Sequence, residues 1–136
     1  MPDRHPLRVA LAVVFALFLL AGASAQGIEL KSSAQVWSGS AATCSQPATV
    51  RFEALRDATP KWRTIRAEGV RKDSARYSLL WSQLNDRIRA ACQKGAEDQA
   101  RDCVVTEGDI KNANGLNVVD LTSEVVRRLE SEQPAS

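Results

Sequence analysis

The stretch Ser74–Ala100, SARYSLLWSQLNDRIRAACQKGAEDQA, decides the fold of this chain. Its apolar and small side chains recur at alternating steps of four and three residues, at Tyr77, Trp81, Leu84, Ile88, Ala91 and Gly95. This spacing places them along one stripe of an α-helix, and Asp73 or Ser74 can cap its start. A helix over 74–100 would be about 40 Å long, which exceeds the width of a small domain. We therefore expect it to project from its own body, to run along a partner, or both.

A second, shorter helix is expected just before this one. Thr59-Pro60 is typical of a helix start, with threonine as the N-cap and proline at the first helical position. Gly69 and the polar run after it predict a turn. Helices at about 60–69 and 74–100 would then form an arm, either a helical hairpin or a coiled coil.

Short strands are expected on both sides of the arm. Alternation of apolar and polar residues predicts strands over 48–53, 103–107 and 116–119. Thr122 is expected to cap a terminal helix that buries one apolar face. The predicted fold is therefore α+β, with a small sheet body built from N- and C-terminal strands, a projecting helical arm and a C-terminal helix.

The first residues have the pattern of a signal peptide. Arg4 and Arg8 precede an apolar run of fourteen residues, and Ala23-Ser24-Ala25 provides a cleavage point before Gln26. The run is shorter than the roughly 20 residues that span a bilayer as a helix. We expect a periplasmic or otherwise exported protein once residues 1–25 are removed.

Cleavage changes the chemistry that the chain can perform. The mature net charge becomes 16 − 15 = +1, and the only histidine, His5, is lost. Without an imidazole, the commonest hydrolase and zinc designs are excluded. No paired carboxylates or nucleophile motif can be argued either, so we predict no enzyme, no cofactor and no metal. The mature chain is expected to form one domain over 48–131, with a flexible extension over 26–47 and a disordered tail over 132–136.

Three cysteines, Cys44, Cys92 and Cys103, are an odd number for an oxidising compartment. Cys44 can bridge either Cys92 or Cys103, which would close a long loop. An intermolecular bond is a further alternative. Cys92 and Cys103 can equally serve as small buried hydrophobic residues.

The region of the turn is strongly basic. Only Glu68 and Asp73 accompany its six cations, which are Lys61, Arg63, Arg66, Arg71, Lys72 and Arg76. One interpretation is a basic arm that attracts acidic clients, lipopolysaccharide or anionic lipid. The other is an ordinary solvated helix face. Nucleic acid is not expected, because the net charge is small and no aromatic-interleaved binding strand is present.

Aromatic residues flank this basic turn at helical spacing. Trp62, Tyr77 and Trp81 either offer an apolar grip for unfolded segments or hold the two helices together. The candidate contact residues for a client or partner are Lys61, Trp62, Arg63, Arg66, Arg71, Lys72, Arg76 and Tyr77.

The C-terminal third carries a family resemblance. Val104-Val105 looks like a returning strand, and residues 118–126, VVDLTSEVV, look like the closing Asp-[Ile/Leu]-Thr-x-[Asp/Glu]-Val signature of the Skp (OmpH-type) periplasmic chaperones. Val50-Arg51-Phe52 followed by Thr59-Pro60 is similar to the opening strand and arm entry of that family. The residues that match the signature are Val104, Val105, Asp120, Leu121, Thr122, Glu124 and Val125.

The resemblance implies a function that the residues alone do not show. Members of that family are secreted trimers whose helical arms hold unfolded outer-membrane proteins. We expect an ATP-independent holdase that binds unfolded envelope proteins, or alternatively a structural or adaptor protein whose long helix binds one fixed partner. The arms here are much shorter than those of the family. A homo-oligomer, trimeric by resemblance, is expected because the stripe over Tyr77–Ile88 would otherwise be exposed.

Overall fold

The long helix predicted from the sequence is α4, Ala75–Asp98, in the computed structural model of the chain. The structure describes residues 27–131; the predicted signal peptide, its cleavage point and the predicted tail, residues 132–136, lie outside the described residues. Ser74 caps α4, because its side chain accepts a hydrogen bond from the backbone N–H of Tyr77 at 3.1 Å. Leu84 and Ile88 on the predicted stripe are fully buried, so the periodicity identified the core face correctly.

A four-stranded mixed sheet forms the centre of the body, in the order β2-β4-β3-β6. Its strands are β2 (Val36–Gly39), β3 (Pro47–Val50), β4 (Cys103–Thr106) and β6 (Val119–Asp120). β3 is parallel to both β4 and β6, whereas β2 is antiparallel to β4. The chain before the arm and the chain after it thus share one sheet, as predicted.

A second, smaller sheet has two strands. It joins β1 (Glu29–Leu30) to β5 (Ile110–Asn112) in antiparallel register. The short 3-10 helix η1 (Ala41–Thr43) lies between β2 and β3.

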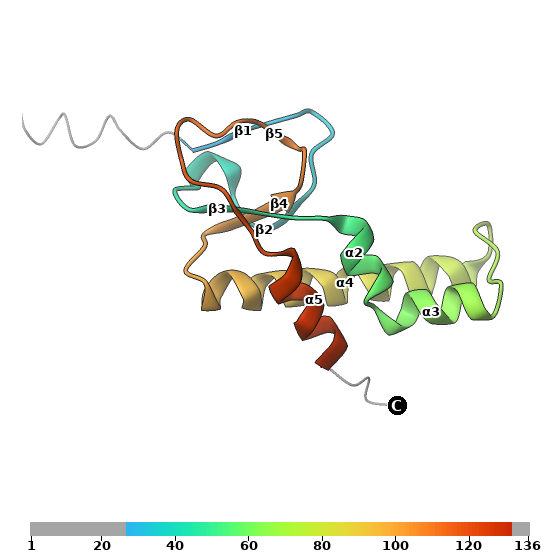
Figure 1. Ribbon diagram of the computed structural model, residues 1–136. Coiled ribbons are helices and arrows are strands. Elements are labelled where there is room, and N and C mark those ends of the chain that lie inside the picture. Colours follow the sequence, from blue (N-terminus) through green and yellow to red (C-terminus); the bar gives the residue numbers. More distant parts are fainter. Residues whose placement is uncertain (1–26, 132–136) are drawn as a thin grey trace, which may run out of the picture.

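Helices cover one face of the main sheet (Figure 1). The C-terminal half of α4 packs there beside α5, Thr122–Ser131. Gly95 makes this close packing possible, since a Cβ built on it would lie 3.3 Å from Cγ2 of Val125. The element that packs closely against Gly95 is therefore α5.

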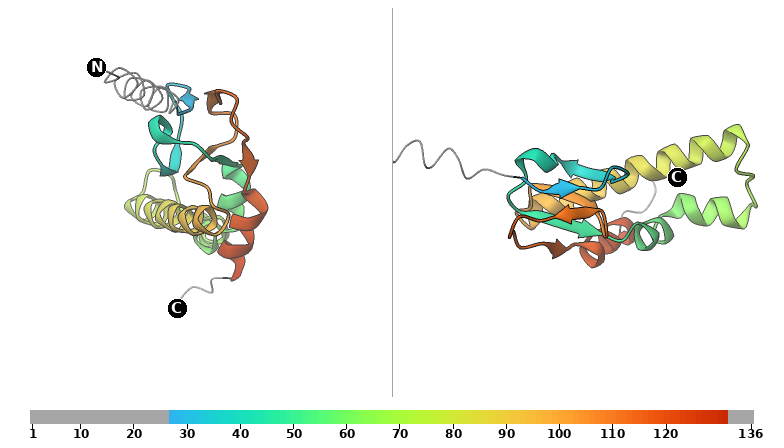
Figure 2. Two further views of the ribbon diagram at one scale, coloured as in Figure 1. Left: turned by 90° about the vertical axis from the view of Figure 1, so that its left-hand side faces the viewer. Right: turned by 90° about the horizontal axis from the view of Figure 1, so that it is seen from above.

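The N-terminal half of α4 leaves the body together with α3, Pro60–Ala67 (Figure 2). α2, Phe52–Asp57, connects β3 to this hairpin. α3 has eight residues, about two turns, so the pair is a short helical hairpin and the coiled-coil alternative is not established. The predicted arm helices and the turn between them are otherwise confirmed. No helix in the described range is both long and apolar enough to span a membrane.

The interpretation of residues 26–47 as a flexible extension is wrong for the described part, 27–47. This segment contains β1, β2 and η1, and its Ile28, Trp37 and Cys44 are buried. Trp37 stacks on Phe52 with ring centroids 5.7 Å apart and donates its indole N–H to Oγ1 of Thr106 at 3.0 Å. The segment is ordered by contacts with residues far along the chain, which local composition does not show.

Two predicted strands end elsewhere. The strand expected over 48–53 stops at Val50, and Phe52 already belongs to α2, so the short alternating run continues into a helix. Of the strand expected over 116–119, only Val119 lies in a strand, which is β6. β5 was not predicted, because Ile110 is its only apolar residue.

Both threonines expected to cap helices play other roles. Thr59 occupies the N-cap position of α3, but its hydroxyl donates to the Leu55 carbonyl at 2.7 Å. Thr122 is the first residue of α5 rather than its cap. The Asp120 carboxylate accepts a hydrogen bond from the Thr122 backbone N–H at 2.8 Å. Oγ1 of Thr122 in turn accepts a hydrogen bond from the backbone N–H of Arg51 at 3.0 Å. These bonds join the start of α5 to the end of β3.

The physical reason given for a homo-oligomer does not hold. The stripe of α4 is covered by its own chain, with Tyr77 and Trp81 half-buried beneath the arm and Leu84 and Ile88 fully buried. Only Leu79 and Val118 among the large hydrophobic residues described are exposed, at 58% and 36%. An oligomer is therefore expected from the family resemblance alone.

Candidate partner-binding arm

The charge of the chain is divided between two regions. We define the arm as residues 56–76, which span the end of α2, α3, the turn and the start of α4, and the body as the other described residues. The arm has seven basic and three acidic residues, a net charge of +4. The body has nine basic and eleven acidic residues, a net charge of −2. The arm is thus the positive pole of a nearly neutral protein.

Ion pairs neutralise only part of the arm. Its three acidic residues each hold one cation, in the pairs Arg56–Asp57, Arg71–Asp73 and Arg76–Glu68. Four cations have no acidic partner within 4.0 Å in the described range, namely Lys61, Arg63, Arg66 and Lys72. These four provide the uncompensated charge that an anionic partner would meet.

Aromatic rings fix the base of the arm. Trp81 of α4 contacts Trp62 of α3 edge-to-face at 6.1 Å and stacks on Tyr77 at 5.9 Å between ring centroids. Phe52 of α2 contacts Trp81 at 6.0 Å and links this group to Trp37 in the core. Such contacts add about 0.5–1.5 kcal/mol per pair beyond burial. The structure thus favours the interpretation in which these aromatics hold the helices together.

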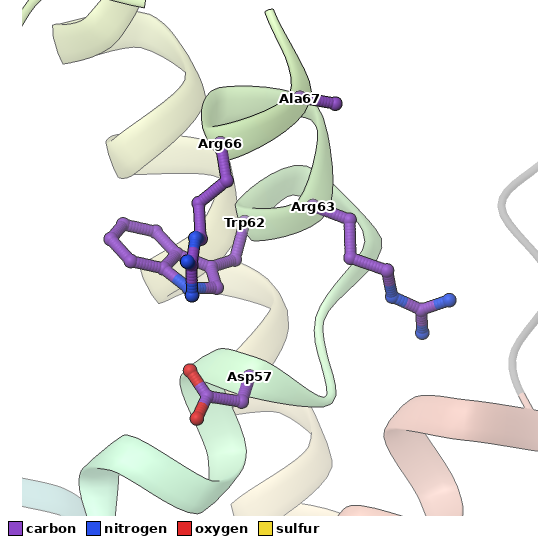
Figure 3. A pocket seen from close by; sticks show the side chains of 5 residues that line it. All are labelled: Asp57, Trp62, Arg63, Arg66 and Ala67. Atoms are coloured by element: carbon purple, nitrogen blue, oxygen red, sulfur yellow. The ribbon is translucent and has the colours of Figure 1, made fainter. Parts of the chain in front are cut away.

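An open pocket of about 580 Å³ lies where the end of α2 meets α3 (Figure 3). It is lined by Asp57, Trp62, Arg63, Arg66 and Ala67. Asp57 comes from the end of α2 and the other four from α3. The pocket combines an aromatic surface with two of the unpaired cations.

The structure divides the eight predicted contact residues into groups. Trp62, Arg63 and Arg66 share the pocket, whereas Arg71 and Arg76 are occupied by Asp73 and Glu68. Lys61 and Lys72 lie outside the pocket, and Tyr77 is half-buried against Trp81. Sequence reasoning missed Asp57 and Ala67 in the lining, as well as Arg56, whose guanidinium lies 4.5 Å from the centre of the Trp62 ring.

The residues that carry the family resemblance are structural in this chain. Val104, Val105, Leu121 and Val125 are buried, and Thr122 is also buried at the junction of β6 and α5. Hydrogen bonds from the Thr122 side chain and backbone hold the pKa of Asp120 below its usual value, against the opposing effect of burial. Glu124 pairs with Arg127 and Arg128 on α5.

A disulfide joins Cys44 to Cys103, one of the two pairings that the sequence allowed. The alternative with Cys92 is excluded, because Cys92 is a free, buried thiol whose pKa burial raises to about 12. A thiol this hard to ionise is unreactive. Cys92 therefore serves as a small hydrophobic residue in the core.

Asp102, which precedes Cys103, also binds the chain that follows Cys44. Its carboxylate accepts hydrogen bonds from the Ser45 and Gln46 N–H groups, both at 2.8 Å. Burial raises the pKa of Asp102, but these bonds outweigh it and hold the pKa below its usual value. Ligand-type atoms of Cys44, Asp102 and Cys103 lie within 4.8 Å of one another. Both sulfurs are bonded to each other and both carboxylate oxygens are engaged, so the oxidised cluster offers no free ligand set.

Comparisons with protein families, with curated proteins and with solved structures find no match to this chain.

Proposed function

We propose that this protein is an exported, ATP-independent holdase-type chaperone that binds unfolded envelope or outer-membrane proteins through its basic arm. The observation that carries the proposal is the net charge of +4 on a projecting hairpin, with four cations free of ion pairs in the described range. Unfolded, acidic polypeptide would be drawn to such a surface by long-range attraction. The resemblance to the Skp (OmpH-type) chaperones supports the same proposal.

The order of the elements is in keeping with that family. β3 leads into helices that run out and back, β4 and β6 return beside β3, and α5 closes the body. In the proposed assembly, several short arms would act together, because one arm offers only a small contact area. The ground for this proposed homo-oligomer, a trimer, is the family resemblance.

The test uses the mature chain and an unfolded outer-membrane β-barrel diluted from urea. We expect the chain to slow aggregation, measured by light scattering, and to co-migrate with the barrel. The triple variant R63Q/R66Q/K72Q removes three of the unpaired arm cations, whereas K31Q/K94Q/K111Q removes the same charge from exposed positions on the body. The arm variant should lose most of the protection and the body variant should keep it. Unimpeded aggregation in the presence of the unmodified mature chain would refute the holdase.

An adaptor that binds one fixed partner is the second candidate. The observation that favours it is the length of α3, whose eight residues are too few for an arm that encloses a client. Recovery of proteins from an envelope extract on immobilised mature chain distinguishes the two. An adaptor should recover one stoichiometric partner, whereas a holdase should recover a mixed set that is displaced by an unfolded barrel.

A further inference from the structure

The pocket on α3 contains hydrogen-bond donors that lack acceptors. The indole Nε1 of Trp62 is buried and has no hydrogen-bond partner in the described range. In the view of Figure 3, the guanidinium of Arg66 is drawn across this indole, and both residues line the same pocket. A guanidinium has only donors, so Arg66 cannot serve the indole N–H. A buried donor without an acceptor is unfavourable, and an incoming oxygen would relieve this cost.

The charges around the pocket also favour an oxygen ligand, and specifically an anionic one. Arg63 and Arg66 have no acidic partner within the described residues, although Asp57 lines the same pocket. Asp57 is held instead by Arg56, through an Nε–Oδ1 distance of 3.1 Å. The Arg66 guanidinium and the Trp62 N–H therefore form a donor pair that fits an anionic oxygen, whereas the Arg63 guanidinium points away from both in Figure 3.

The remaining lining indicates which anion fits. Trp62 and Ala67 provide apolar surface next to the cations, which suits a polypeptide with apolar side chains beside its acidic ones. Asp57 would repel a doubly charged phosphate more strongly than a singly charged carboxylate. The pocket is open, and the exposed Arg66 side chain that lies across the Trp62 indole in Figure 3 would have to shift for an oxygen to reach the buried N–H.

We propose that this pocket binds an aspartate or glutamate side chain of an extended segment, with a neighbouring apolar residue seated against Trp62. The carboxylate accepts from the Arg66 guanidinium and the Trp62 N–H, while Arg63 adds long-range attraction. This inference rests on the proposed function and specifies which part of an unfolded client the arm recognises. Acidic, aromatic segments are the preferred ligand class.

The experiment measures binding of two fluorescent peptides to the mature chain by anisotropy at low salt. One peptide repeats Asp-Phe and the other repeats Asn-Phe, so they differ only in charge. We expect the acidic peptide to bind about tenfold more tightly, as a charge-assisted hydrogen bond of about 1.5 kcal/mol implies. R66Q should lower that affinity about tenfold, and W62F, which keeps an aromatic ring at this position but removes the indole N–H, should lower it about threefold. K94Q, an equal charge change on the body, should alter it less than about twofold.

Each outcome decides the inference. Arg66 is exposed and its side chain makes no ion pair or hydrogen bond in the described range, so R66Q should fold, which circular dichroism verifies. Unchanged binding of the acidic peptide to R66Q overturns the proposal, as does equal binding of both peptides. Binding of phosphatidylglycerol vesicles that depends on Arg66, without binding of the acidic peptide, also overturns it in favour of a lipid site.

The experiments can refute the holdase and the pocket independently of each other. If the mature chain prevents barrel aggregation and R66Q does so equally well, the holdase stands and the pocket is not its recognition site. If the acidic peptide binds through Arg66 but barrel aggregation is not slowed, the pocket stands and the holdase is wrong.

Discussion

The arm and the body of this protein are held together in different ways. The body ties its N-terminal segment to the rest by a disulfide, two sheet pairings and the burial of Trp37. The arm is held by the burial of Ile65 and by aromatic contacts at its base, and five of its seven cations are exposed. Stability should therefore depend on the body and binding on the arm.

The largest effect is expected from Trp37→Ala. Trp37 is fully buried, stacks on Phe52 and satisfies the hydroxyl of Thr106. Its loss should lower the free energy of unfolding by about 4–5 kcal/mol, measured by urea denaturation. Leu79→Ala, at an exposed position of α4, is the control and should cost less than about 0.5 kcal/mol. A cost below about 1.5 kcal/mol for Trp37→Ala would mean that residues 27–46 do not belong to the body.

Removal of the disulfide should have the next largest effect. Cys44 and Cys103 are 59 residues apart, so reduction should destabilise the protein by about 4 kcal/mol in the chain-entropy model. Denaturation of the mature chain with and without reductant measures this difference. The variant C44A/C103A should not respond to reductant, and a similar response in both proteins would contradict the account.

The same division explains what the sequence could predict. The arm and α4 were predicted correctly because their stability follows local periodicity, as at Leu84 and Ile88, and a local cap at Ser74. The attachment of residues 27–46 was missed because Trp37 and Cys44 are held by Thr106 and Cys103, far along the chain.

The candidate site was predicted only in part. A run of cations is visible in sequence, so Arg63 and Arg66 were identified. The unpartnered N–H of Trp62 and the engagement of Asp57 by Arg56 depend on how α2 meets α3. No sequence pattern indicates such an angle between two short helices.

A smaller effect is expected at the contact between α4 and α5. Gly95→Val should destabilise the body by about 2 kcal/mol, because the added carbons would collide with Val125. In Gly95→Ala, a gain of about 1 kcal/mol in helix propensity should offset most of the crowding. Ala90→Val, on the exposed side of α4, should cost only about 0.5 kcal/mol. Equal costs for the two valine variants in urea denaturation would argue against close packing at Gly95.

The smallest effect is expected in acid. The pKa values of Asp102 and Asp120 are both lowered in the folded protein, so their contribution to stability is present above about pH 4. It is lost as the pH falls through the lower, folded-state pKa values. Both carboxylates are well exposed, so each contribution should be below about 1 kcal/mol.

Urea denaturation at pH 7 and pH 3 tests this expectation. Asp120→Asn should reduce the loss of stability between the two values, because it removes the carboxylate whose pKa is lowered by folding. An equal loss of stability in Asp120→Asn and the unmodified mature chain would show that this carboxylate does not contribute.

The most direct test of the division between arm and body is the affinity of the mature chain for a labelled unfolded outer-membrane barrel. The account predicts that R63Q/R66Q/K72Q binds at least about tenfold more weakly than the unmodified chain, while K31Q/K94Q/K111Q stays within about twofold. Unchanged affinity in the arm variant, or an equal loss in the body variant, would contradict it.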